Sequence, residues 1–379
     1  MRIFIAGDFA PRHRIAEQIE KGDYSCLNEV KPLVQTADYA IVNFESPVVM
    51  REANPIEKTG PNLRCSEKAM ECVAQAGFNC VTLANNHFRD YGQIGVEDTI
   101  DSCEKNDVDH VGGGRSKQAA EQTLYITIHG RKLAIINVCE NEWSIATENY
   151  GGSNPLNPIK NYYAIQEAKT NADNVLVIVH GGIEGYNLPT PRMKEAYRFF
   201  VDAGADAVVN HHQHCFSGYE VYKGSPIFYG LGNFCFDTSS IYKNDLWVHG
   251  YLVELNFSES ITFKVYPYKQ CDEESPAVSM CVDTDTFTSS IEHLNAVIAN
   301  ARQLEQQYND FTSKRASIAK NILAPYPKGL IRKVYAKGFL PSFASKFRKK
   351  QLLAYIQCES HRDVLLQGLY NDIIVHEGF

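Results

Sequence analysis

The sequence predicts an α/β protein in which two packed β-sheets carry helices on their outer faces. In roughly the first 200 residues, short β-rich apolar runs alternate with stretches of helical periodicity, which is typical of α/β architecture. Three further stretches have the pattern of antiparallel hairpins, and strand signals fade after about residue 270. With 379 residues, of which 44% are hydrophobic, the chain can bury a substantial core.

Six apolar runs predict strands, and several of them are apolar throughout, as in strands that are covered on both faces. They are residues 2–6, 39–44, 80–84, 133–138, 174–179 and 206–209. Helical periodicity predicts helices over residues 66–77, 96–107 and 191–204, two of which end at glycine, a favoured residue just past a helix end. The predicted hairpins cover residues 124–138, 219–234 and 251–268.

The C-terminal part of the chain is predicted to be mainly helical and partly basic. Helices are expected over residues 288–309, 314–323, 343–357 and 362–373. We therefore expect an α/β domain over residues 1–270 and a helical, basic extension over residues 271–379. Residues 314–351 contain 11 Lys and Arg and no Asp or Glu, although the whole chain has a net charge of −8.

The basic stretch at residues 328–350 interleaves its charges with Tyr335, Phe339, Phe343 and Phe347. Such a pattern can bind an anionic polymer or an anionic membrane surface. The alternative is a solvated helical face that packs its aromatic side chains on the first domain, and Pro341 argues against one continuous amphipathic helix. The chain contains no recognisable nucleic-acid-binding motif.

The cysteine pattern indicates a protein with reduced thiols. The 11 cysteines are odd in number and scattered, and none belongs to a C-x-x-C pair. At the N-terminus Asp8 interrupts the apolar run too early for a signal peptide, and no run approaches the ~18 apolar residues of a membrane span. We therefore expect a cytoplasmic protein, either free or peripheral at the inner face of the membrane.

Polar side chains follow five of the predicted strands, at the point where each strand ends. These side chains are Asp8, Glu45, Asn85 to His87, His180 and His211 to His214. In α/β sheets ligands bind at the carboxyl ends of the strands, so five separate stretches of chain can converge on one site. Carboxylate, amide oxygen and imidazole together suit a divalent cation of the Zn, Mn or Fe kind. The sequence therefore predicts a metal site at this edge.

The segment HHQH at residues 211–214 gives the strongest single signal for that site. If the strand exit stays extended, His212 and His214 project to the same side and His211 to the other. We therefore expect His212 and His214 to bind metal and His211 to be an outer or surface residue. Taken alone, His180 would more often be a hydrogen-bonded interior histidine and Asp8 a turn residue. The metal prediction depends on the five strand ends together.

Six ordered motifs make the chain resemble the CapA family of poly-γ-glutamate capsule biosynthesis proteins. The motifs are GDFAP (7–11), ADYAIVNFESPV (37–48), LANNHFRDYG (83–92), VIVHGGIEGY (177–186), DAGADAVVNHHQH (202–214) and PIFYGLGNFCFD (226–237). That family is similar to calcineurin-like metallophosphoesterases. The resemblance therefore implies a bacterial protein, a four-layer α/β/β/α sandwich of two mixed sheets, and a dinuclear metal centre.

The resemblance also implies a role for each matching residue. The implied metal ligands are Asp8, Glu45, Asn86, His180, His212 and His214. Glu45 matches the bridging carboxylate, His87 matches the non-ligand histidine near the reacting group, and Asp90 is placed to orient His87. Ala10 stands where the wider superfamily usually has a histidine, so one metal site is expected to have fewer ligands. Glu184 is a further candidate acid or base, or else a solvated loop carboxylate.

The sequence thus favours a metal-dependent hydrolase in which a hydroxide held between divalent ions attacks a phosphoester or an amide. His87 would protonate the leaving group or stabilise developing charge. The substrate would be an anionic small molecule or polymer, because the resemblance points to an amide-linked polyanion and the superfamily to phosphoesters. The alternative is a non-catalytic accessory protein that binds or helps to export an anionic polymer and keeps a vestigial metal site.

Overall fold

The computed structural model describes residues 1–238, 245–281, 284–315, 329–336, 339, 346–358, 360–366 and 368–369. The chain forms two compact units, Met1–Glu305 and Gln306–Phe379. The first unit extends past residue 270, because helix α9 (Thr284–Ala299) packs Phe287 and Ile291 into its core. All the strands of the described chain belong to this first unit.

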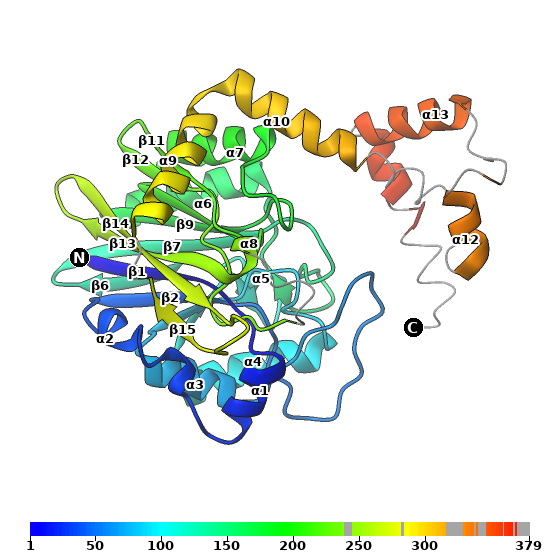
Figure 1. Ribbon diagram of the computed structural model, residues 1–379. Helices are drawn as coiled ribbons and strands as arrows, with labels where there is room; N and C mark the ends of the chain where they lie inside the picture. Colours follow the sequence, from blue (N-terminus) through cyan, green and yellow to red (C-terminus); the bar gives the residue numbers. More distant parts are fainter. Residues whose placement is uncertain are drawn as a thin grey trace. The chain divides into compact units, whose positions relative to one another are not determined.

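Two mixed sheets form the centre of the first unit (Figure 1). In spatial order, the first sheet contains β15 (Val278–Met280), β14 (Ile261–Gln270), β13 (His249–Phe257), β1 (Arg2–Phe9), β2 (Tyr39–Phe44), β3 (Cys80–Thr82) and β4 (Asp109–Val111). The second contains β11 (Tyr219–Tyr222), β12 (Ser225–Phe228), β10 (Ala207–His211), β9 (Asn174–His180), β7 (Arg131–Cys139) and β6 (Leu124–Ile128). A small separate ladder joins β5 (Gly113–Gly114) to β8 (Gly152–Ser153).

Both sheets combine a parallel centre with antiparallel hairpins, as the sequence predicts. Strands β1 to β4 are parallel to one another, and β13, β14 and β15 extend that sheet in antiparallel fashion. In the second sheet β7, β9, β10 and β12 are parallel, while the edge strands β6 and β11 are antiparallel to their neighbours. All three predicted hairpins are present, as β6–β7, β11–β12 and β13–β14.

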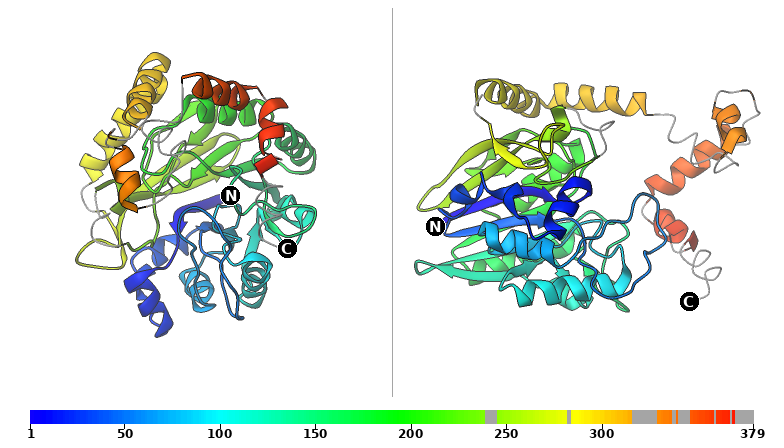
Figure 2. Two further views of the ribbon diagram at one scale, coloured as in Figure 1. Left: turned by 90° about the vertical axis from the view of Figure 1, so that its right-hand side faces the viewer. Right: turned by 60° about the horizontal axis from the view of Figure 1, so that its bottom comes forward.

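Helices cover the outer face of each sheet (Figure 2). Those associated with the first sheet are α1 (His13–Glu20), α2 (Lys31–Val34), α3 (Lys68–Ala76) and α4 (Gly92–Lys105), with the 3-10 turn η1 (Ser25–Leu27). Against the second sheet pack α6 (Pro158–Asn171) and α7 (Pro191–Asp202). The remaining described helices are α5 (Lys117–Ala120), α8 (Asp245–Val248), α10 (Ala301–Lys314), α12 (Gly329–Ala336) and α13 (Lys346–Gln357).

The core is divided between these layers by the two-residue period of the strands. In β1, Ile3 and Ile5 face the second sheet and pack with its apolar side chains, while Phe4 and Ala6 face the helices. Every residue of β2, β9 and β10 is buried, which explains their continuous apolar sequences. The predicted four-layer α/β/β/α sandwich of two mixed sheets is therefore confirmed.

The C-terminal predictions are only partly covered by the structure. The helix expected at residues 288–309 is divided at Asn300 into α9 and α10, and the helix expected at 343–357 is present from Lys346. The helix expected at 314–323 lies almost entirely outside the described residues, as do parts of 328–350 and 362–373. None of the described helices combines the length and the apolarity needed to cross a bilayer.

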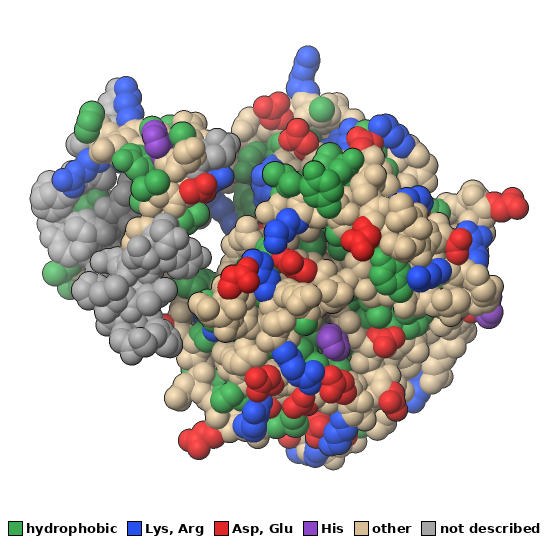
Figure 3. All heavy atoms as spheres, turned by 180° about the vertical axis from the view of Figure 1, so that it is seen from behind, with side chains coloured by type: hydrophobic (Ala, Val, Ile, Leu, Met, Phe, Trp, Pro, Cys, Tyr) green, Lys and Arg blue, Asp and Glu red, His purple; other side chains and the backbone are tan. Residues whose placement is uncertain are grey.

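Charges on the first unit are mixed in sign. Figure 3 shows Asp and Glu side chains interspersed with Lys and Arg over the face turned towards the viewer. Ion pairs of this unit include Lys169 with Asp206 and Arg198 with Glu220. Ion pairs that are exposed to solvent contribute little to stability.

A close backbone approach at Gly7 joins β1 to the segment that follows β12. A Cβ atom at Gly7 would lie 2.0 Å from the Gly232 carbonyl oxygen and 2.9 Å from the Tyr268 hydroxyl. The absence of a side chain lets the Asp8 amide donate to the Gly232 carbonyl at 3.1 Å and the Phe234 amide donate to the Asp8 carbonyl at 2.7 Å. Gly7 thus brings the end of β1 against residues 232–234.

We expect Gly7→Ala to destabilise the first unit by about 3 kcal/mol or more, at the upper end of overpacking costs, because the atom it would meet is backbone and cannot rotate away. Urea unfolding of the full chain measures this loss. Gly22→Ala is the control: its Cβ would enter open space, so it should cost only the left-handed backbone penalty of about 1 kcal/mol. Equal losses for the two variants would contradict the close-approach explanation.

Candidate metal centre

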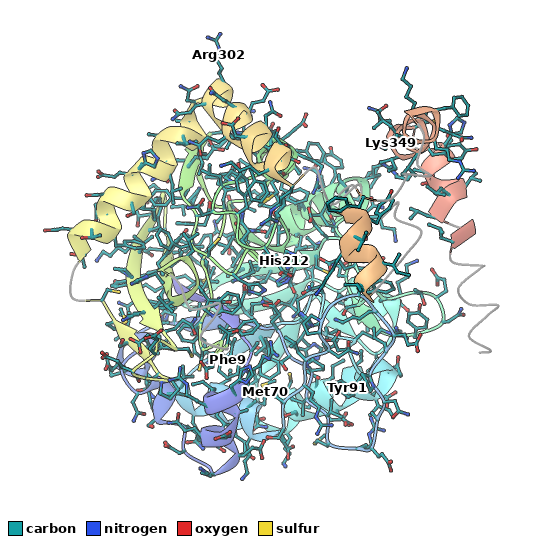
Figure 4. The ribbon with its side chains drawn as sticks, turned by 45° about the vertical axis from the view of Figure 1, so that its right-hand side comes forward. Phe9, Met70, Tyr91, His212, Arg302 and Lys349 are labelled. Carbon is teal, nitrogen blue, oxygen red and sulfur yellow. The ribbon has the colours of Figure 1, made fainter. Side chains whose placement is uncertain are left out.

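The carboxyl ends of strands from both sheets bring six predicted ligands together. Asp8 lies in β1, Glu45 directly after β2, and Asn86 on the segment that follows β3. His180 ends β9, while His212 and His214 follow β10. All six residues are at most 7% exposed, and Figure 4 places His212 well inside the first unit. Strand ends that are far apart in sequence therefore form one buried polar cluster.

Two groups within this cluster have the spacing needed to hold a cation. One group contains Glu45, His180 and His212, and the other contains Asp8, Glu45 and His214. In each group the potential ligand atoms lie within 4.8 Å of one another. Among the described residues, Glu45 alone belongs to both groups, so its carboxylate can serve two neighbouring positions.

The Glu45 carboxylate fits a metal ligand better than a structural acid. It is fully buried, and neither of its oxygens has a hydrogen-bond partner among the described residues. Its Oε1 lies 3.5 Å from His180 Nε2 and 3.7 Å from His214 Nε2. Burial raises the pKa of Glu45 well above its usual value. An unpaired buried carboxylate is costly, and a cation shared with these imidazoles would offset that cost.

Asp8 is held by donors from several segments. Its Oδ1 accepts from Asn43 Nδ2 at 2.8 Å and lies 3.2 Å from His211 Nδ1. Its Oδ2 accepts from the His212 backbone amide at 3.2 Å and lies 3.4 Å from His214 Nδ1. Burial raises the pKa of Asp8, but the contacts with His211 and His214 outweigh it and leave that pKa well below the usual value. Its lowered pKa therefore favours the ionised form of Asp8 at neutral pH.

His180 and Asn86 meet on the side of the cluster nearest β3 and β9. His180 Nε2 lies 3.1 Å from Asn86 Oδ1 and 3.0 Å from His212 Nδ1. The other ring nitrogen of His180 lies 3.3 Å from Asn43 Nδ2. Burial lowers the pKa of His180 well below its usual value, so the imidazole is neutral, as a metal ligand must be.

Glu142 supports two of the predicted ligands at once. Its Oε1 lies 3.6 Å from His212 Nε2, the nitrogen on the far side from His180, and its carboxylate accepts a hydrogen bond from the Asn86 side chain. A carboxylate beyond a histidine ligand orients the ring and raises its basicity. Burial lowers the pKa of His212 to about 4 and raises that of Glu142. Glu142 follows β7, so the strand-end pattern extends to a sixth strand.

His214 has a different environment from the other histidines. Its Nδ1 lies 2.9 Å from Asn233 Oδ1, and its ring packs against Phe236 and Trp247 at centroid distances of 5.1 Å and 5.3 Å. Burial alone would lower the pKa of His214, but the carboxylates of Glu45 and Asp8 outweigh it and raise the pKa to about 10. The pKa of His214 is thus shifted in the opposite direction to those of His180 and His212.

The histidines after β10 converge by a route that the sequence did not predict. The expectation that His212 and His214 project to the same side was conditional on an extended strand exit, and that condition is not met, since β10 ends at His211. His212 and His214 have φ values of 90° and 55°, in the left-handed region. Each turn redirects its side chain towards the cluster. His211 is buried and contacts Asp8, but it belongs to neither candidate ligand group.

His87 lies next to Asn86 and is held by two charged residues. Its Nδ1 lies 2.6 Å from Asp90 Oδ2, as expected for an orienting carboxylate, and 3.2 Å from Lys58 Nζ. Lys58 also forms an ion pair with Asp90. Burial lowers the pKa of His87 despite the attraction of Asp90. Glu184 is exposed on the loop after β9, and its charge contributes to the pKa shifts of Glu45, His212 and His214.

Sequence reasoning missed three residues that hold the site. Asn43 is a buried polar residue inside an apolar strand, and that interruption was a signal that could have found it. Glu142 follows a predicted strand, so the strand-end rule also reaches it. Lys58 lies on a loop without any periodicity, and no sequence pattern singles it out.

One groove of the first unit lies away from this cluster. It has a volume of about 610 Å³ and is bordered by α7, β11 and the start of α10. None of the candidate ligands lines it, and its walls carry both signs of charge, including Lys194, Glu195 and Arg198. The assignment of the site therefore depends on ligand chemistry and distances, and not on the size of a cavity.

Comparison with known proteins matches residues 2–238 to the family described as bacterial capsule synthesis protein PGA_cap. The chain is 37% identical over 201 residues to the capsule biosynthesis protein CapA of Bacillus anthracis, covering 51% of this chain and 49% of that protein. It is 34% identical over 227 residues to the PGA biosynthesis protein CapA of Bacillus subtilis, covering 59% of each. The chain thus spans about half the length of these relatives.

Two further similarities are weaker. A Mycobacterium tuberculosis protein named "Probable polyglutamine synthesis accessory protein" is 29% identical over 173 residues, covering 42% of this chain and 45% of that protein. A crystal structure from Staphylococcus aureus, provisionally described as a 5′-nucleotidase, is 14% identical with a TM-score of 0.45, covering 80% of this chain and 58% of that one. That structural similarity is too low to bear on function.

We expect binding of a divalent cation to release protons, because Glu45 and His214 have raised pKa values and must lose their protons to become ligands. Affinity should therefore rise with pH, by roughly tenfold per pH unit for each proton released, up to the His214 pKa of about 10. Titration calorimetry in buffers of different ionisation enthalpy counts these protons. The exposed variant His129→Gln should leave the count unchanged, and a pH-independent affinity would contradict the prediction.

We expect Glu142→Gln to weaken metal binding by about 10- to 100-fold, because the charge that orients His212 and Asn86 is removed. Metal content after dialysis and calorimetric titration measure this loss. Glu148→Gln is the matched control, since Glu148 belongs to the same loop but its side chain is 82% exposed and pairs with Lys117. If both variants retained metal equally, Glu142 would have no part in the site.

Proposed function

Because the chain belongs to the bacterial capsule synthesis protein family PGA_cap, we propose that it is a metal-dependent hydrolase of a capsule or polyanionic-polymer pathway. The single observation that carries the proposal is the buried Glu45 carboxylate, unpaired among the described residues and shared by two groups of potential ligands. In this proposal Asp8, Asn86, His180, His212 and His214 complete a site for one or two divalent ions such as Mn, Zn or Fe.

The donor set supports this assignment chemically. Carboxylates, a side-chain amide and neutral imidazoles are hard to borderline ligands, which suit Zn, Mn and Fe and do not require thiolates. Ions held there would make a water molecule acidic near neutral pH and stabilise negative charge on a substrate. Asp8 and Glu45 would balance the charge of the ions, while Asn43, Glu142 and Asn233 hold the ligands in place.

His87 has the geometry of a proton-transferring residue beside this centre. Its Nδ1 faces the Asp90 carboxylate at 2.6 Å, so its Nε2 is the atom free to exchange a proton with a leaving group. It is adjacent in sequence to Asn86, which ties its position to the ligands. Glu184 is the second candidate acid or base in this proposal, since it lies exposed on the loop after β9 and its charge contributes to the pKa shift of His212.

The proposed substrate is an anionic molecule or polymer that carries a phosphoester or a γ-linked amide. The names of the relatives from Bacillus anthracis and Bacillus subtilis support a capsule polymer, and hydrolysis at a metal centre suits either bond. The basic segment 328–350, part of which lies outside the described residues, is proposed to bind an anionic polymer or membrane surface. The chain spans about half the length of these relatives, so the substrate and the role of the basic segment are proposed for this chain.

The second candidate is a non-catalytic accessory protein that binds such a polymer. Ala10 favours it, because the position of a histidine ligand in the wider superfamily is occupied here by a fully buried methyl group. The name of the Mycobacterium tuberculosis relative also contains the word accessory. The two candidates differ in one observable, namely whether any substrate is turned over.

We expect the purified full chain to contain divalent metal and to hydrolyse at least one generic substrate in the presence of Mn²⁺. The substrates are bis-p-nitrophenyl phosphate, p-nitrophenyl phosphate and γ-glutamyl-p-nitroanilide. Chelation should abolish turnover, and His212→Gln should lower both metal content and kcat/KM, the latter by at least about 100-fold. Elemental analysis and initial rates measure the two effects.

His129→Gln is the control variant, because His129 is an exposed histidine far along the chain from the proposed ligands. Turnover that survives both chelation and Glu45→Gln would refute the metal-dependent mechanism. Metal binding without turnover of any of the three substrates, together with retention of poly-γ-glutamate in equilibrium dialysis, would favour the accessory function.

A further inference from the structure

Lys58 lies on a long loop, and its side chain is buried beside the candidate metal centre. The loop runs between Val48 and Cys65, which form an isolated parallel bridge at its base. The Lys58 side chain is only 3% exposed, and its ammonium group pairs with Asp90 Oδ1. Lysines are almost never buried to this degree unless they are paired. The ion pair with Asp90 is therefore what keeps Lys58 inside the protein.

Both oxygens of the Asp90 carboxylate face donors. Oδ1 pairs with Lys58. Oδ2 accepts from the Leu63 amide at 2.6 Å and lies 2.6 Å from His87 Nδ1. Its backbone carbonyl also accepts from the Ile56 amide at 2.9 Å and from Asn62 Nδ2 at 3.2 Å. The loop that carries Lys58 is thus anchored on Asp90 at several points, and the carboxylate has no freedom to rotate.

These contacts select one tautomer of His87. Two cases are possible for Nδ1. If it carries a proton, that proton can be donated only to Asp90, because the Lys58 ammonium group has no lone pair. If it carries none, its lone pair would face the lone pairs of the Asp90 oxygen. Since Nδ1 lies 2.6 Å from Asp90 Oδ2 but 3.2 Å from Lys58 Nζ, the geometry favours a proton on Nδ1 that is donated to Asp90. Lys58 then acts on the other oxygen of the same carboxylate.

We propose that Lys58 is a positioning residue of this site: by holding Asp90 Oδ1, it makes Asp90 fix His87 as the Nδ1–H tautomer. The imidazole then presents Nε2 to the substrate. This inference rests on the proposed function, in which His87 protonated at both nitrogens gives its Nε2 proton to the leaving group and is left as the neutral Nδ1–H tautomer that Asp90 holds. This role also explains why the irregular loop that carries Lys58 reaches back to His87.

The test compares Lys58→Met and Lys58→Arg with Lys105→Met in the full chain. Lys105 is the matched control because its side chain is 63% exposed and also pairs with an acid, Glu67. Long-range ¹H–¹⁵N NMR of zinc-supplemented protein with ¹⁵N-labelled histidine reports the tautomer, and the His87 signals are those missing in His87→Gln. Steady-state kinetics report kcat and KM separately, and elemental analysis reports metal content.

We expect wild-type His87 to carry its proton on Nδ1, and Lys58→Met to convert part of the population to the Nε2–H tautomer. We also expect Lys58→Met to lower kcat by about 10- to 100-fold while KM changes by less than about threefold and metal content stays constant, as for loss of a residue that supports a functional group. Lys58→Arg should keep the tautomer and recover most of kcat. Lys105→Met should change none of these values.

A wild-type His87 with its proton on Nε2 would overturn the proposal, and so would an unchanged tautomer and kcat in Lys58→Met. If Lys58→Met failed to fold, the proposal would still be tested by the tautomer of wild-type His87 and by the tautomer and kcat of Lys58→Arg. A wild-type chain that turns over no substrate would refute the proposed hydrolase function, but the NMR result would still test the role of Lys58. The two failures are therefore distinguishable.

Discussion

The buried carboxylate of Glu45 is the constraint on which the rest of the site depends. Removing an ionised carboxylate from water costs several kcal/mol, and among the described residues no hydrogen bond offsets this cost. The strand ends of two sheets surround it with one carboxylate and three imidazoles, which are all potential ligands. The raised pKa of Glu45 has the same origin, because burial penalises the ionised form of this carboxyl group.

Backbone geometry, more than strand alternation, brings these side chains together. Gly7 allows β1 to touch the segment after β12, which delivers Asn233 to His214 and the Asp8 carbonyl to Phe234. A left-handed residue with a Cβ costs about 1–2 kcal/mol, yet His212 and His214 both have this conformation. Such strain persists where the surrounding contacts determine it, as the Asp8 bond to the His212 amide does here.

The layers, the three hairpins and the family could be predicted from the sequence, because apolar periodicity and ordered motifs are local properties. The convergence of Asp8, Glu45 and His180 was predictable too, since parallel strands end at the same edge. The path of the chain after β10 was not, because left-handed turns at histidines follow from tertiary contacts. Lys58 was invisible for the same reason: its role depends on a loop folding back onto Asp90, and no spacing in the sequence records that contact.

The two ligand groups that share Glu45 differ in what lies behind them, and this difference gives the site a direction. Behind His214 stand the rings of Phe236 and Trp247, and the buried methyl group of Ala10 packs in the same cluster. Behind His212 lies Glu142, whose side chain is 38% exposed, and the exposed Glu184 belongs to the loop after β9. The cluster is therefore bordered by apolar side chains next to His214 and by a partly exposed carboxylate next to His212. Ala10, at the position where the resemblance implies a histidine in the wider superfamily, contributes a buried methyl group to this apolar border.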